Sequence, residues 1–171
     1  MADTTELMLQ AWRVLFREAF HGKAGDGSWF VESHENGGLL ANLRRVNAQQ
    51  ASRPAPGGGP SIAAHAEHVR WFLRLAARLA SPERDTINWD APDVKWANSR
   101  GVSQVNEAAW TNLIETLERE AGAVEAGLNL EAIEGRQSSD EMTGCLTVLP
   151  HAAYHLGAVR QLIRAVLAPN G

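Results

Sequence analysis

Apolar residues recur every three or four positions along most of this chain, which is the spacing of a helix with one buried face. No run of alternating β-branched residues favours a strand, so the pattern predicts an all-α fold. Long helices are expected over Thr5–His21, from an N-cap at Ser61 to Ala80, from an N-cap at Ser103 through a stripe that ends at Leu128, and from Asp140 onward, with a short helix over Leu39–Val46.

The first predicted helix shows the pattern clearly. Its apolar stripe contains Met8, Trp12, Phe16, Ala19 and Phe20, and Gly22 follows as a stop signal. An apolar face this wide has to be buried against partner helices.

Three of the connections between the predicted helices come after the short one. Residues 52–60 contain three Pro and three Gly, and we interpret them as a loop rather than a domain linker because neither flank alone provides a complete core. Residues 82–102 lack periodicity and contain Trp89 and Trp96; a connection of that length in a compact domain is interpreted as a lid or pocket wall. Residues 129–139 form the third connection.

Length and composition place these helices in one domain, residues 1–171. With 44% hydrophobic and 21% charged residues, the chain resembles neither a disordered nor a membrane protein. Four long amphipathic helices in a domain of this size predict an antiparallel four-helix bundle with a short extra helix and long connecting loops.

Charge and cysteine content narrow the partners. The formal net charge is -4, so the chain lacks the excess of basic residues that nucleic-acid binding needs. We therefore expect neither DNA nor RNA as a partner. A single cysteine, Cys145, rules out a disulfide framework and a cysteine-pair zinc site, and its simplest role is that of a small core residue. The acidic start of the chain does not resemble a leader, so a cytoplasmic protein is expected.

The histidines of the last predicted helix carry the clearest chemical signal. His151 and His155 are four positions apart, so both rings lie on one helix face and can reach one metal ion. Pro150 is expected to kink the helix just before His151. The alternative is a pair of core histidines, each hydrogen-bonded to a neighbour; each ring would cost roughly 1–3 kcal/mol if it were left unsatisfied.

The second predicted helix offers further histidines on or beside its apolar face. Either His65 or His68 can meet the first pair and complete a three-histidine site. Such a donor set matches a catalytic divalent site that keeps one position for water or substrate. At 100° per residue, His65 lies nearer the centre of the apolar face than His68 does.

Other chemistries have little support. Only Glu18 and His21 have the Glu-x-x-His spacing, which occurs twice in a di-iron bundle, and they lie at a polar helix end. The chain has no His-Glu-x-x-His motif, no Gly-x-Ser-x-Gly motif and no phosphate-binding loop with Lys and Ser or Thr. A carboxylate-bridged di-iron centre is therefore not expected.

Two segments resemble the DinB-like superfamily, also described as YfiT-like metal-dependent enzymes. They are His-Ala-Ala-Tyr-His-Leu-Gly-Ala-Val-Arg-Gln at residues 151–161 and Ser-Ile-Ala-Ala-His-Ala-Glu-His at residues 61–68. The resemblance implies a four-helix bundle, often a homodimer, with a divalent metal held by one histidine of the second helix and two of the last. By motif these ligands are His68, His151 and His155, and His65 remains an alternative ligand or a neighbour of one.

Characterised branches of that superfamily resemble S-transferases or isomerases that use a low-molecular-weight thiol such as bacillithiol, mycothiol or glutathione. The resemblance therefore implies a metal-dependent enzyme that binds Zn²⁺ or Ni²⁺ and activates a thiol, or water in a hydrolase, toward a small-molecule substrate. A non-enzymatic bundle that binds metal or a small ligand as a sensor or stress protein is the alternative. Tyr154, Lys95 and Trp96 are candidate pocket residues.

Overall fold

The computed structural model describes residues 3–23, 27–31, 37–81, 86–95, 104–135 and 138–168. These residues form helices and no strand, so the all-α prediction is confirmed for this part of the chain. In chain order the helices are α1 (Thr4–His21), α2 (Leu39–Leu43), α3 (Ala48–Ala51), α4 (Ile62–Ala80), α5 (Glu107–Gly127), α6 (Leu130–Glu134), α7 (Ser139–Leu146) and α8 (Val148–Leu167).

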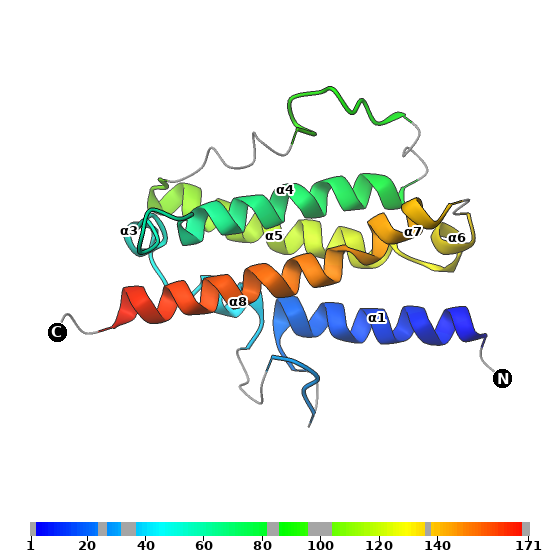
Figure 1. Ribbon diagram of the computed structural model, residues 1–171, viewed down its shortest axis with the longest axis horizontal. Helices are drawn as coiled ribbons and strands as arrows, with labels where there is room; N and C mark the ends of the chain where they lie inside the picture. Colours follow the sequence, from blue (N-terminus) through cyan, green and yellow to red (C-terminus); the bar gives the residue numbers. More distant parts are fainter. Residues whose placement is uncertain are drawn as a thin grey trace.

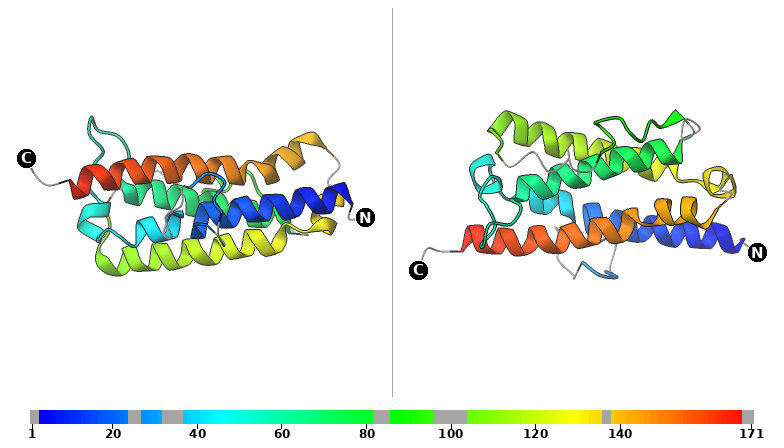
Figure 2. Two further views of the ribbon diagram at one scale, coloured as in Figure 1. Left: turned by 90° about the horizontal axis from the view of Figure 1, so that it is seen from below. Right: turned by 45° about the horizontal axis from the view of Figure 1, so that its top comes forward.

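Four long helices, α1, α4, α5 and α8, lie side by side along the molecule (Figures 1 and 2). Helices α1 and α8 run in one direction, and α4 and α5 run in the opposite direction (Figure 1). Arg13 of α1 accordingly donates a 3.0 Å hydrogen bond to the carbonyl of Leu128, just after the end of α5. At the same end, a Cβ added at Gly127 would lie 3.4 Å from the Cβ of Ala80, the last residue of α4. Helices α4 and α5 are therefore parallel, unlike an arrangement in which every neighbouring pair is antiparallel.

The core follows the predicted helix faces with one exception on α1. Phe16 is fully buried, with its ring centroid 4.8 Å from that of Trp12 and 4.7 Å from that of Phe20. Met8, expected on the same stripe, is 64% exposed, and its neighbour Leu9 is buried instead. At 100° per residue, Leu9 lies about 35° from the mean direction of Trp12, Phe16, Ala19 and Phe20, whereas Met8 lies about 65° from it on the other side. Gly22 ends α1 as predicted, with a φ of 91° that favours glycine.

Helix α5 begins later than expected. Its N-cap is Asn106, whose side-chain oxygen accepts a 2.8 Å hydrogen bond from the N–H of Ala109. Ser103, the predicted cap, lies outside the described residues. A second asparagine, Asn129, accepts a hydrogen bond from the N–H of Ala132 and caps α6, which falls inside the predicted connection 129–139.

The predicted last helix is divided into α7 and α8 at Thr147, a full turn before the expected kink. The cause is Pro150, which lies inside α8 and has no N–H to donate to the carbonyl of Leu146, four residues earlier. The proline ring also crowds that carbonyl, so the disturbance appears at residues 146–147. The N–H of His151 then bonds to the carbonyl of Thr147 at 3.0 Å, and α8 continues without interruption.

The short helices after α1 are held by close contacts with its end. The predicted helix over Leu39–Val46 ends at Leu43, and α3 follows. Gly38, the N-cap of α2, packs so tightly on the end of α1 that a Cβ there would lie 2.3 Å from the backbone nitrogen of Gly22. Only glycine allows this approach.

A buried carboxylate holds the segment that follows α1. The Oε1 atom of Glu18 accepts hydrogen bonds from the hydroxyl of Ser28 at 2.5 Å and from the N–H groups of Trp29, Phe30 and Val31 at 2.8–3.1 Å. Burial by itself would raise the pKa of Glu18, but these hydrogen bonds outweigh it and lower the pKa below its ordinary value. Glu18 therefore stays charged and fixes residues 28–31 against α1.

None of the helices that the structure describes is both long enough and apolar enough to cross a membrane.

Candidate metal centre

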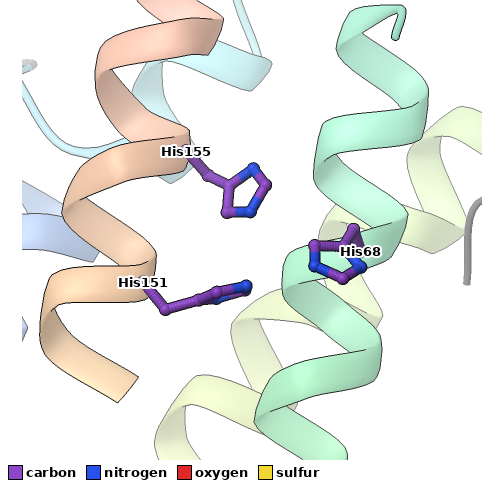
Figure 3. Close-up of side chains that lie close together, drawn as sticks. All are labelled: His68, His151 and His155. Carbon is purple, nitrogen blue, oxygen red and sulfur yellow. The ribbon is translucent and has the colours of Figure 1, made fainter. Parts of the chain in front are cut away.

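The second and last long helices bring four histidines together. Helix α4 begins at a Ser61 cap, whose hydroxyl accepts a 3.2 Å hydrogen bond from the N–H of Ala64, and this places His65 and His68 within the first two turns. Helix α8 runs antiparallel to α4 and presents His151 and His155 to the same space (Figures 1 and 3).

Three of these side chains form a compact cluster. One ring nitrogen each of His68, His151 and His155 lies within 4.8 Å of the others. The ring centroid of His68 is 5.1 Å from that of His151 and 5.1 Å from that of His155, and those of His151 and His155 are 4.5 Å apart. Figure 3 shows the three rings pointing into one space between α4 and α8. The geometry thus brings together the three residues that the motif singled out.

His65 contacts the cluster through His155. Its Nδ1 lies 2.8 Å from the Nδ1 of His155, which is a buried hydrogen bond between the two rings. One of these nitrogens must carry the proton. When His155 donates, its Nε2 keeps a lone pair that is free to bind a metal; when His65 donates, the proton of His155 occupies Nε2. The bond therefore couples the protonation of His65 to the ability of His155 to act as a ligand.

Burial keeps three of the four histidines neutral. Burial, together with the charged forms of the nearby His151, His65 and His68, lowers the pKa of His155 to about 3. Burial and His68 likewise lower the pKa of His151 to about 4, and the same two causes lower the pKa of His65. At neutral pH these rings are uncharged and carry a lone pair, which is the form that binds a metal.

Aromatic side chains of α4 hold two of the rings in place. Phe72 stacks on His151 with centroids 4.1 Å apart, and Trp71 stacks on His68 at 5.5 Å. The Nε1 of Trp71 donates to the carbonyl of Asp93 at 2.9 Å, so the described part of the long connection also supports this arrangement. Stacking restricts the rotation of the rings.

A pocket of about 610 Å³ opens beside the cluster. All four histidines line it, and so does Tyr154, which is 69% exposed and touches His155 edge-on. The remaining walls come from Ser52, Pro54, Gly58, Gly59, Pro60, Ser61, Ala64 and Gln104. The Pro- and Gly-rich segment is predicted from sequence only as a loop. Its position directly before the helix with His65 and His68 was the signal that it could line the histidine pocket.

The other predicted pocket residues lie elsewhere. Lys95 does not line this pocket, and its Nζ pairs with Asp90 at 2.7 Å. Trp96 lies outside the described residues. Residues 86–95 pack on the outward face of α4, where Asp93 is 3.4 Å from Arg78, so this part of the expected lid does not form a wall of the histidine pocket.

The donor set suits a divalent transition metal. Neutral imidazoles bind Zn²⁺, Ni²⁺ and related ions, with nitrogen–zinc distances of about 2.0–2.1 Å. Tetrahedral ligands at that distance are about 3.3 Å apart, so the nitrogens of the cluster would approach one another by at most about 1.5 Å on binding. Small side-chain rotations provide movements of that size, and the three histidines are thus close enough to bind a metal.

Comparison with models of protein families gives no match, and none of the curated proteins or solved structures with which the chain was compared matches it.

Proposed function

We propose that this protein is a metal-dependent enzyme in which His68, His151 and His155 hold one divalent ion, Zn²⁺ or Ni²⁺. The observation that carries the proposal is the convergence of three imidazoles from two helices on one wall of a pocket. A low-molecular-weight thiol or water would reach a bound ion through that pocket.

Two features favour an open, catalytic position over a closed, structural one. A structural zinc site has four protein ligands. His65 does not belong to the group of histidines whose ring nitrogens lie within 4.8 Å of one another, and its Nδ1 is engaged by His155. The pocket beside the cluster is large enough for a small substrate.

The side chains would act on the reaction in distinct ways. A bound divalent ion lowers the pKa of a thiol or water molecule and so provides a nucleophile at neutral pH. His65 would accept the Nδ1 proton of His155 and so leave the Nε2 lone pair of that ring available to hold the ion. Tyr154 stands at the exposed rim of the pocket, where its phenol can donate a hydrogen bond to a substrate.

Thiol transfer to an electrophilic carbon is preferred to hydrolysis because of the resemblance to the DinB-like superfamily. Membership of that superfamily, a four-helix bundle with one long crossover connection, and a homodimer are parts of the same proposal. Such a bundle is supported by the opposite directions of two helix pairs, α1 with α8 and α4 with α5. It is also supported by the long connection between α4 and α5.

Metal content provides the first test. Purified protein is expected to contain, or to take up from a titration, one divalent ion per chain, and His68→Ala, His151→Ala and His155→Ala should each lose most of that affinity. His21→Ala is the matched control, because His21 is exposed at the end of α1. Full metal content in the His151→Ala and His155→Ala variants would refute the site, and loss in His65→Ala but not in His68→Ala would refute the choice of ligand.

Activity separates the remaining alternatives. The metal-loaded protein is expected to accelerate the reaction of a low-molecular-weight thiol with a generic alkylating electrophile, and the His151→Ala variant should not. Turnover of an activated ester without thiol would indicate a hydrolase instead. Metal binding without either activity would favour a sensor or stress protein.

A further inference from the structure

A second pocket, of about 670 Å³, lies on the other side of α8. Its lining residues are Gly37, Ala41, Asn42, Arg44, Arg45, Arg160 and Arg164. Arg160 follows His151 by nine positions, which is about half a turn of rotation around the helix, so this pocket and the histidine pocket lie on opposite faces of α8.

Four arginines converge on this pocket, and no Asp or Glu is among its described lining residues. Arg44 pairs with Glu118 at 2.7 Å, but both side chains are about half exposed. Arg45 donates to the neutral side chain of Asn42 at 3.4 Å. Such a concentration of positive charge contrasts with the net charge of -4 for the whole chain.

Helix electrostatics explain only part of the cluster. Arg164 lies in the last turn of α8, where a positive charge is favourable, but that effect fades within one turn. Arg44 and Arg45 follow the end of α2, which has only five residues, and Arg160 lies about two turns before the end of α8, so this effect does not account for all four arginines. Arg45 and Arg164 bring like charges to one cavity, and a bound anion removes the repulsion between them.

We propose that this pocket binds a small molecule that carries two or more phosphate groups. The planar guanidinium group matches the oxygens of a phosphate with paired hydrogen bonds. A cavity of about 670 Å³ is larger than one inorganic phosphate requires and suits a diphosphate or triphosphate. Ala41 is the largest apolar side chain in the lining, so the recognised feature is the phosphate chain rather than an aromatic ring.

The overall charge favours a small anion over a nucleic acid. A nucleic acid extends beyond the pocket and meets the repulsion of a negatively charged chain, whereas a compact anion interacts with the local cluster within a Debye length.

Calorimetric titration of the full chain with tripolyphosphate tests the proposal. Wild-type protein is expected to bind it more tightly than inorganic phosphate, with an affinity that falls as ionic strength rises. Because a charged hydrogen-bonding partner contributes about tenfold or more, the double variant Arg45→Gln, Arg164→Gln should bind about a hundredfold more weakly. Arg74→Gln is the matched control, since Arg74 lies on α4 near Asp93 and outside the pocket.

A second variant separates this pocket from the histidine cluster. His151→Gln, measured after treatment with a chelator, should bind tripolyphosphate as the wild-type protein does. Absence of binding at millimolar tripolyphosphate, equal binding by the double arginine variant, or loss of binding in His151→Gln would each overturn the proposal. Tighter binding of a single-stranded oligonucleotide than of tripolyphosphate would overturn it in favour of a nucleic-acid surface.

Discussion

Acidification should destabilise the metal-free protein in the pH range where histidines titrate. His151 and His155 have pKa values of about 4 and about 3 in the folded protein, against about 6.5 in an unfolded chain. The unfolded state therefore binds more protons at mildly acidic pH. The contribution of these two histidines to the free energy of unfolding is fully present above about pH 6.5. It is lost progressively as the pH decreases toward their folded pKa values of about 4 and about 3.

The size of the effect follows from these values. Integrating the difference in proton binding from pH 7 to pH 5 gives about 2 kcal/mol for each histidine, or about 4 kcal/mol for the pair. That is a large share of the 5–15 kcal/mol typical of a domain. Glu18 does not add to the loss in this range, because its lowered pKa keeps it charged and its contribution disappears only below the unfolded value of about 4.5.

Urea denaturation followed by tryptophan fluorescence measures the effect. Chelator-treated wild-type protein is compared at pH 7, 6 and 5 with the double variant His151→Gln, His155→Gln, which keeps polar side chains but cannot titrate. The variant should lose much less free energy of unfolding between pH 7 and 5 than the wild-type protein does. Equal losses in the two proteins, or a wild-type stability that does not change with pH, would show that the burial argument is mistaken.

Three further predictions concern the residues that support the cluster and the fold. His65→Leu should weaken metal binding by about 10- to 100-fold in a calorimetric titration, because it removes the hydrogen-bond partner of a ligand, whereas unchanged affinity would contradict that role. Glu18→Gln should lower the free energy of unfolding in urea by about 2–3 kcal/mol and speed amide exchange in residues 28–31; slow exchange would count against the anchoring role. Gly38→Ala should cost about 1–3 kcal/mol or more in thermal unfolding, while Gly122→Ala in the open interior of α5 should gain about 1 kcal/mol; similar effects at both positions would argue against the close contact.

The helical core was predictable because burial depends on which face of a helix a residue occupies. The spacing of Trp12, Phe16 and Phe20 is sufficient to place them together. Helix ends are decided by local competition among caps, so Asn106 replaced the predicted Ser103 as the start of α5. Pro150 was recognised as a disturbance, but its effect lies four residues earlier, at the carbonyl that its missing N–H would have bonded.

The pairing of His151 and His155 on one helix was predictable, whereas the histidine that joins them from α4 was ambiguous. A spacing of four places His151 and His155 on one face, whatever surrounds them. The rotation of α4 about its axis decides how His65 and His68 meet that face, and sequence periodicity defines this only loosely. Both histidines reach α8: His68 joins His151 and His155 in the cluster, and His65 is hydrogen-bonded to the Nδ1 of His155. The anchoring by Glu18 could not be predicted, because its partners are mainly backbone N–H groups of a loop.

The division of the cluster between α4 and α8 has a consequence for the order of folding. His68 and His151 are separated by about 80 residues in the sequence, so no local fragment of the chain contains the complete set. The three rings meet only when the last long helix has docked, and an ion held between them would act as a cross-link that closes a long loop of the unfolded chain. During synthesis on the ribosome, the ability to retain metal would thus mark the moment at which the chain has finished folding.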